Sequence, residues 1–188
     1  YKKEKAMEYF KLNKQKVLEA IVYILNKIGG SDHHKILKIL FYADKLHLNS
    51  YGRPVCGDVY RKMTYGPVGS FARDILQINE CRLKDFKPIV EAAIHTEKVK
   101  PFPLSYSLRM CDDDEFSETD LECLDSAIAF CKDKTFGQLT DETHKEKSWI
   151  EASENGVMDY VNFVDEGNPY ASEIKKELES GITKYMVV

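Results

Sequence analysis

The sequence has little that would cross-link the chain or carry it into a membrane. Its five cysteines form no CxxC pair, and their odd number argues against a closed disulfide framework or a zinc ribbon. The apolar runs are short, as at 39–43, and fall far below the roughly 20 residues that span a bilayer. The charged start of the chain also lacks the continuous apolar stretch of a secretory signal peptide. We therefore expect a cytoplasmic protein with reduced thiols and no membrane partner.

Short motifs of common catalytic and nucleotide-binding sites are also missing. The sequence contains no Walker loop, dinucleotide fingerprint, HExxH or GxSxG segment. Asp44 and His47 would share a helix face, but no nucleophile or third ligand accompanies them, so a buried polar pair is the favoured interpretation. His33 and His34 would point about 100° apart, which suits an exposed helix start better than a metal site. We therefore expect no enzymatic activity, no cofactor and no bound metal.

Charge is unevenly distributed along the chain. The net charge is −4, yet residues 1–110 carry +9 and residues 111–188 carry −13. The hydrophobic share of 43% and the charged share of 31% are typical of a soluble globular protein. A chain of this length fits one domain, in which folding buries roughly 70% of the unfolded-state surface. We predict a single domain over 1–188.

Hydrophobic periodicity predicts a mostly α fold of the α+β class, with several helices, a buried central helix and a small β-hairpin. A first helix should end at Gly29-Gly30, and a second should run from about 33 to 48. Because the second helix is apolar on more than one face, we expect it to be central. Residues 53–65 indicate no clear element. The remaining predictions are helices at 67–78, with Pro67 in the first turn, 117–131, 136–144, 148–154 and 169–180, and strands at 89–96 and 104–110, with Pro101 and Pro103 between them.

The basic half of the chain suggests DNA as a partner, but only weakly. Two helices followed by a hairpin loosely resemble a winged helix-turn-helix. The helix at 33–48 is too apolar to lie in a groove, and its lysines, Lys35, Lys38 and Lys45, suit solvent or phosphate better than base edges. The lysine-rich arm at 2–16 reads more simply as a solvated face. DNA binding is therefore disfavoured.

The most distinctive short segment is Tyr65-Gly66-Pro67-Val68. Gly-Pro before a helix gives a pre-set entry, and Tyr65 adds a flat aromatic surface. With Tyr51, Tyr60 and Phe71 this segment could form an aromatic pocket or a protein-binding hot spot. A hydrophobic staple at a helix start explains it equally well.

Motifs in both halves of the chain resemble one known family. They are Lys38-Ile39-Leu40-Phe41-Tyr42-Ala43-Asp44-Lys45-Leu46-His47-Leu48, Tyr51-Gly52-Arg53-Pro54, Gly57-Asp58, Tyr60, Met63, Tyr65-Gly66-Pro67-Val68, Phe116-Ser117-Glu118-Thr119-Asp120, Phe136-Gly137-Gln138-Leu139, Thr143-His144 and Trp149. In this order, over about 37–149, they resemble the Panacea domain of the SocA-like antitoxins, formerly labelled phage-associated proteins. The lysine-rich segment before Gln15 and the acidic segment after Trp149 lie outside the resemblance and are candidates for partner specificity.

This resemblance implies a bacterial antitoxin of a toxin–antitoxin system. Such a protein neutralises a cognate toxin, encoded by a neighbouring gene, through direct protein–protein binding without catalysis. One family member instead delivers its toxin to a ClpX-type unfoldase, so a proteolytic adaptor is the alternative, and a DNA-binding regulator of its operon is another.

The resemblance also selects candidate site residues. The motif positions are Tyr42, Asp44, His47, Tyr51, Arg53, Tyr65, Gly66 and Pro67. They form either a common toxin-binding surface or the internal framework of the fold, and the sequence leaves both open. We add Tyr106 and Arg109 in the expected hairpin, because protein interfaces favour Tyr and Arg as anchors.

Overall fold

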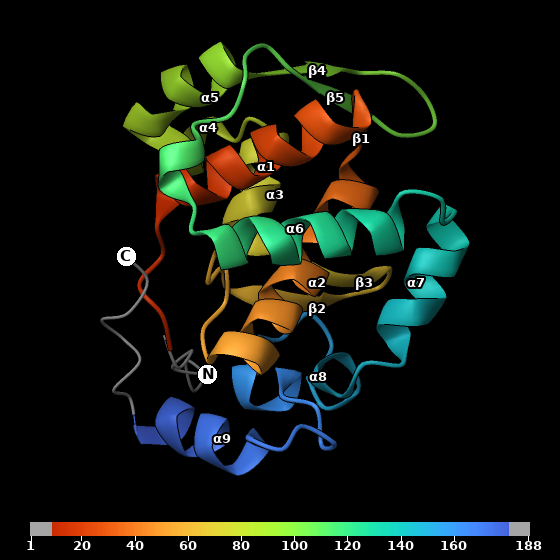
Figure 1. The fold of residues 1–188 in the computed structure, drawn as a ribbon. Helices are drawn as coiled ribbons and strands as arrows, with labels where there is room; N and C mark the ends of the chain where they lie inside the picture. Colours follow the sequence, from red (N-terminus) through yellow and green to blue (C-terminus); the bar gives the residue numbers. More distant parts are fainter. Residues whose placement is uncertain (1–8, 181–188) are drawn as a thin grey trace.

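Helices dominate the fold, which confirms the predicted mostly α, α+β class (Figure 1). The computed structural model describes residues 9–180, so Lys2, Lys3 and Lys5 of the lysine-rich arm lie outside the described residues. The helices are α1 (Lys14–Ile28), α2 (His33–Tyr51), α3 (Ser70–Leu76), α4 (Glu80–Leu83), α5 (Lys87–Ala93), α6 (Glu118–Cys131), α7 (Phe136–His144), α8 (Lys147–Ile150) and α9 (Ala171–Ser180), with 3-10 turns η1 (Lys84–Phe86), η2 (Asp113–Glu115) and η3 (Tyr160–Phe163).

Local signals in the sequence set most helix boundaries. The side chain of Asp32 caps α2 by accepting a hydrogen bond from the Lys35 backbone N–H. A capping box is present at the start of α6, with Ser117 and Asp120 bonding each other's backbone. Helix α2 continues to Tyr51, beyond the predicted end at 48, because the chain leaves the helix only at Gly52, whose φ of 75° favours glycine. Helices α8 and α9 are shorter than predicted.

Two small antiparallel sheets complete the fold. One has the order β1 (Ser31–Asp32), β5 (Leu104–Ser107) and β4 (Ile94–Glu97), and the other pairs β2 (Tyr60–Met63) with β3 (Gly66–Gly69). The β4–β5 pair is the predicted hairpin, with Ile94 opposite Ser107 and both prolines in its connection. The β2–β3 hairpin was not predicted.

Two sequence predictions are wrong. Residues 89–93 are helical and belong to α5, because Pro88 lies in the first helical turn and Glu91-Ala92-Ala93 favours helix, so the strand begins only at Ile94. Pro67 lies in β3, not in a helix. Helix α3 begins at Ser70 because Asp58, 13 residues before Phe71, accepts hydrogen bonds from the backbone N–H groups of Phe71 and Ala72.

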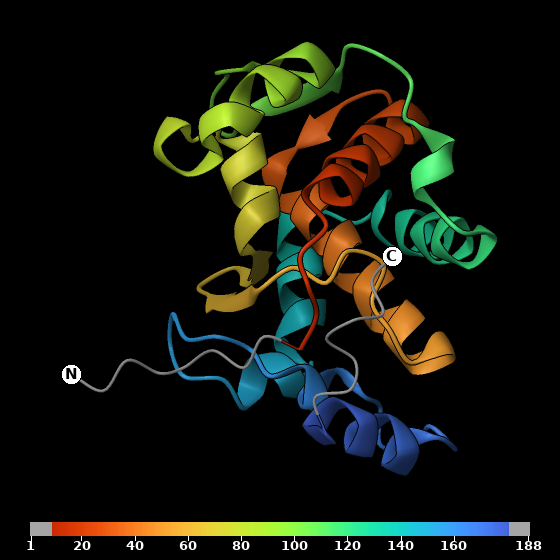
Figure 2. The same cartoon turned by 90° about the vertical axis from the view of Figure 1, so that its left-hand side faces the viewer.

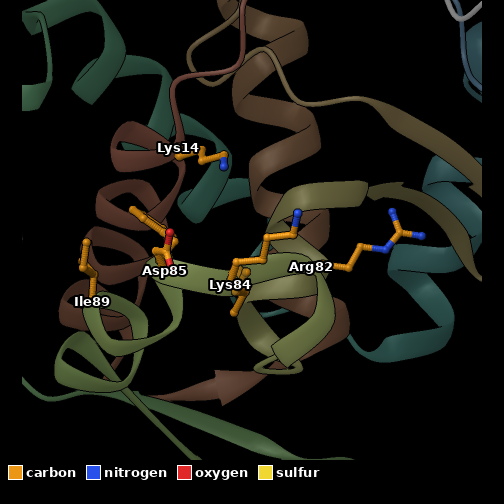
Figure 3. Close-up of a pocket in the computed structure, with 7 residues that line it drawn as sticks. Lys14, Arg82, Lys84, Asp85 and Ile89 are labelled. Atoms are coloured by element: carbon orange, nitrogen blue, oxygen red, sulfur yellow. The ribbon is translucent and has the colours of Figure 1, made fainter.

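The segment from α4 to α5 packs near α1 and leaves a basic hollow on the surface (Figure 3). The hollow has a volume of about 380 Å³. It is lined by Lys14, Arg82, Leu83, Lys84, Asp85, Phe86 and Ile89. None of the ten predicted site residues lines this hollow. Its lining has three basic side chains and one acidic side chain, so it is net positive like the rest of residues 1–110.

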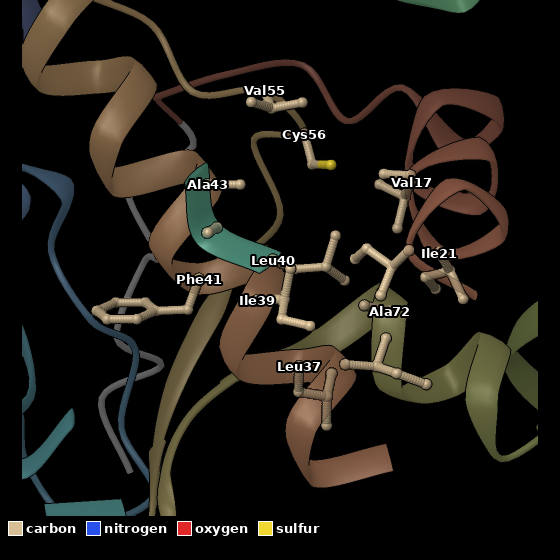
Figure 4. Close-up of a cluster of buried hydrophobic side chains, with 14 of the residues drawn as sticks. Val17, Ile21, Leu37, Ile39, Leu40, Phe41, Ala43, Val55, Cys56 and Ala72 are labelled. Atoms are coloured by element: carbon tan, nitrogen blue, oxygen red, sulfur yellow. The ribbon is translucent and has the colours of Figure 1, made fainter. Parts of the chain in front are cut away.

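Helix α2 is central, as its apolar faces predict (Figures 1 and 2). It contacts α1, α3, α6, α7 and β3, and every residue from 36 to 44 is buried. Figure 4 shows Leu40 of α2 on the side that faces Val17 and Ile21 of α1, whereas Phe41 points to the opposite side. The part of α2 from 36 to 44 is therefore enclosed by its neighbours. Among residues 9–180, no helix is long and apolar enough to cross a bilayer.

Candidate functional site

Asp44 and His47 are buried structural groups. The Asp44 carboxylate accepts hydrogen bonds from the Cys56 backbone N–H at 2.7 Å and from the Tyr60 hydroxyl at 3.0 Å, and burial raises its pKa to about 7. The His47 ring binds other partners: Nδ1 lies 2.7 Å from the Arg53 carbonyl and Nε2 lies 3.0 Å from the Thr119 hydroxyl. Burial lowers the pKa of His47. The two side chains share α2 and are both buried, but they bond separate partners and not each other, so the predicted polar pair does not form.

Arg53 takes part in a buried ionic network centred on Asp120. The Asp120 carboxylate lies 2.8 Å from Lys16 Nζ and 2.8 Å from Arg53 Nη1, and it also accepts the Ser117 backbone N–H. Burial opposes ionisation, but the bonds from Arg53 and Lys16 hold the pKa of Asp120 at about 2. The network ties α1, α6 and the segment after α2 together.

Gly66 and Pro67 attach the β2–β3 hairpin to the helices below it. The buried Lys38 ammonium donates a hydrogen bond to the Pro67 carbonyl at 2.8 Å, and burial lowers the pKa of Lys38 to about 7. Gly66 has a φ of 97°, and a Cβ there would lie 2.3 Å from the Thr143 hydroxyl of α7. Only glycine fits this position.

Three motif tyrosines differ in exposure. Tyr42 is buried and lines a hollow of about 370 Å³ between α2 and α6, together with Leu46 and Phe130. Tyr51 is 47% exposed, and its hydroxyl donates to Glu122 at 3.2 Å. Tyr65 is 58% exposed. Of the eight motif positions, Tyr51 and Tyr65 therefore present the most ring surface to a partner.

The two hairpin candidates are partly engaged within the fold. Arg109 makes a two-pronged contact with the buried Glu19 carboxylate, at 2.8 Å and 2.5 Å. The Tyr106 ring packs over Gly30, where a Cβ would meet its Cδ1 atom at 2.5 Å. Both side chains keep part of their surface exposed, and their roles as anchors stay predictions.

Four rings from separate elements form a cluster that the sequence did not reveal as a unit. We call His34, Tyr65, Phe102 and Phe136 the aromatic cluster. The Phe136 ring stacks on His34 with centroids 3.9 Å apart and on Phe102 at 5.0 Å, and Tyr65 meets its edge at 5.2 Å. Only Tyr65 was among the predicted site residues, and the other signal was the motif that begins at Phe136.

The structure corrects two expectations about these residues. His34 is half-buried and not exposed, because its ring lies against Phe136 and its Nε2 lies 3.1 Å from the Tyr65 carbonyl. Tyr60 and Phe71 form no pocket with Tyr65. The Tyr60 ring is buried against Phe41 and Phe163, and the Phe71 ring packs on Phe86.

The described part of the chain offers no metal site and no disulfide. No group of three or more His, Cys, Asp or Glu side chains in it could hold a metal ion. All five cysteines are free thiols. His144, at the end of α7, stacks on Trp149 with centroids 3.8 Å apart, which is a packing contact.

Comparison with known proteins gives one family. The model of the family described as antitoxin SocA-like, Panacea domain, matches residues 36–150, more than half of the chain. This segment runs from α2 to the end of α8 and includes three members of the aromatic cluster. No curated protein and no solved structure matches.

Proposed function

Because the chain belongs to the family of SocA-like antitoxins with a Panacea domain, we propose that it neutralises a cognate protein toxin by binding it directly. The match over 36–150 is the observation that carries this proposal, since it includes the central helix, both hairpins and the motif residues that link them. The toxin is expected to be the product of a neighbouring gene.

The proposed action needs no catalysis. Asp44, His47 and Arg53 all hydrogen-bond within the fold, and His47 faces a backbone carbonyl and a hydroxyl that orient it. An inhibitor needs only a surface that fits its target, and such surfaces are rich in aromatic anchors. The exposed Tyr51 and Tyr65 supply anchors of this kind.

Co-expression tests the proposal. The neighbouring open reading frame is induced alone and together with this chain, and growth is followed. We expect arrest in the first case and restored growth in the second, with the two proteins co-purifying. A neighbour that is harmless alone, or arrest that this chain does not relieve, would show that the proposal is wrong.

Two measurements distinguish direct inhibition from the alternatives, which are a proteolytic adaptor and a DNA-binding regulator of the operon. An adaptor for a ClpX-type unfoldase shortens the half-life of the toxin, whereas an inhibitor leaves it unchanged and works in a purified mixture without protease. A regulator of the operon shifts a promoter fragment at low salt. We expect an unchanged half-life and inhibition by the purified protein.

A further inference from the structure

The aromatic cluster is a fixed platform on the surface. Its rings come from the start of α2, the β2–β3 turn, the β4–β5 connection and the start of α7, and Figure 1 shows that the turn and the connection both reach toward the side where α7 lies. His34 joins three of these elements, since its Nε2 lies 3.1 Å from the Tyr65 carbonyl and 3.3 Å from the Thr140 hydroxyl of α7. The platform therefore loses little side-chain freedom when a partner binds.

The rings of the cluster leave substantial apolar surface open. Tyr65 is 58% exposed and Phe102 is 45% exposed, whereas Phe136 and His34 are half-buried beneath them. A stacked contact holds Phe102 on Phe136, and an edge-to-face contact holds Tyr65 there. Rigid aromatic side chains around a packed centre are typical of the residues that contribute most to protein binding.

We call the exposed lysines that lie close to the cluster rings along the chain its lysine border. Lys98 and Lys100 are exposed in the connection that carries Phe102, and Lys132 is exposed at the end of α6, four residues before Phe136. The Lys132 carbonyl accepts a hydrogen bond from Lys35 of α2 at 2.7 Å, which brings a fourth ammonium to this edge. The acids in the same stretches are Glu97 and Asp133, and Lys98 also lines a hollow with Glu80 of α4 and Glu91 of α5. Over 97–100 and 132–134, together with Lys35, five lysines stand against two acids, so these stretches are net positive.

We propose that the aromatic cluster and its lysine border are the toxin-docking surface, and that the occupant is an acidic segment of the toxin carrying a flat apolar side chain. This inference rests on the proposed function. The apolar side chain would lie against Tyr65 and Phe102, and the carboxylates would face Lys98, Lys100 and Lys132. Charge complementarity of this kind mainly accelerates association, and the aromatic contacts slow dissociation.

A protein segment fits this surface better than a single-stranded nucleic acid. Base stacking needs open ring faces, but the Phe136 ring already stacks on both His34 and Phe102. Phe102 turns one face to Phe136, and His34 is half-buried.

Alanine variants test the aromatic part of the surface. Tyr65→Ala and Phe102→Ala are compared with Tyr170→Ala, which removes a ring that is 67% exposed and lies outside the family match. The probe is the purified product of the neighbouring gene, and affinity is measured by calorimetry. We expect at least a tenfold loss of affinity for each cluster variant and none for the control, with the thermal unfolding midpoints nearly unchanged.

Charge reversal tests the lysine border. Lys98→Glu with Lys100→Glu should lower the association rate and reduce its dependence on salt, whereas Lys176→Glu on α9 should change neither. Full affinity in the alanine variants, or an unchanged association rate in the charge variant, would show that the toxin docks elsewhere. The proposal that the wild type neutralises the toxin would be unaffected by that result. A wild type that neither binds nor neutralises would instead refute the proposed function. Binding of a single-stranded oligonucleotide that the same variants abolish would assign the surface to nucleic acid.

Discussion

At the scale of single residues, the motif positions mostly serve the fold. Asp44, His47, Gly66 and Pro67 each contact another element through a buried hydrogen bond or a close approach. Buried polar groups of this kind are costly to leave without a partner, so each position accepts few other residues. These four motif positions therefore make contacts inside the fold, and whether the motif also forms a binding surface stays a prediction.

Gly66 gives the most direct test of that framework. Gly66→Ala would place a Cβ 2.3 Å from the Thr143 hydroxyl at a φ of 97°, and we expect a loss of at least about 2 kcal/mol of unfolding free energy. Gly137→Ala in α7 is the control, because a Cβ there meets nothing within 4 Å and alanine favours helix. Chemical denaturation measures both. An equally stable Gly66→Ala chain would contradict the close approach.

The buried Lys38 should make the stability of the protein depend on pH, and the direction follows from its pKa shift. Its pKa falls from 10.5 to about 7 on folding, so the unfolded chain binds the proton more tightly, and stability contributed by this group rises between pH 7 and pH 10.5. Lys38→Met keeps the apolar stem and removes the amine. The wild type should therefore gain stability relative to this variant as the pH is raised from 7 to 10. A difference that stays constant over this range would show that Lys38 is charged in the folded protein.

At the scale of elements, a distant side chain replaces the local cap of α3. Gly69 precedes the helix and has no side chain, and a Cβ there would lie 2.6 Å from Asp58 Oδ2. Asp58 accepts hydrogen bonds from the backbone N–H groups of Phe71 and Ala72 at 3.0 Å and 2.9 Å. Asp58 therefore links the segment before β2 to the start of α3.

Asp58→Ala should weaken the start of α3. It leaves two buried N–H groups without acceptors, and we expect a loss of about 2–4 kcal/mol in unfolding free energy. Asn79→Ala removes a cap at the start of the short α4, where Asn79 accepts the Arg82 N–H at 3.3 Å, and should cost less than about 1 kcal/mol. Hydrogen exchange would show faster opening of α3 in the first variant. Equal protection in both variants would argue against a role for Asp58 as a cap.

At the scale of the whole molecule, the basic and acidic parts of the chain interlock. Lys16 of α1 pairs with Asp120 of the acidic part, and Glu19 of α1 accepts the Asp112 backbone N–H at 2.8 Å. Helix α1 also supplies fully buried side chains such as Val17 and Ile21, yet it precedes the segment that matches the family. The folding unit is therefore larger than the matched segment.

The Lys16–Asp120 pair tests this connection. Asp120→Asn removes the charge that faces buried Lys16 and Arg53, and we expect a loss of about 3–5 kcal/mol in unfolding free energy. The double variant with Lys16→Met should lose less than the sum of the two single changes. Because the pKa of Asp120 is depressed to about 2, its contribution is complete above pH 3.8 and lost as the pH falls toward 2. Additive losses in the double variant would mean that the two groups do not interact.

The sequence predicts the long helices well because their signals are local. Periodic apolar residues and the capping box formed by Ser117 and Asp120 define α1, α2, α6 and α7. The β2–β3 hairpin has no such signal, since Tyr60-Arg61-Lys62-Met63 lacks alternation and is held by Lys38 and by a bridge between Arg61 and Val157. The aromatic cluster was missed for the same reason: its four members meet only through long-range packing.

The joining of four distant chain segments in the aromatic cluster also affects how long the protein persists in a cell. A partner that contacts all four segments can bind only the folded chain. At a free concentration 100 times its Kd, such a partner raises the free energy of unfolding by about 2.7 kcal/mol. Proteases that act on opened chains would then degrade the free protein faster than the complex. The amount of this protein would follow the amount of its partner without any change in gene expression.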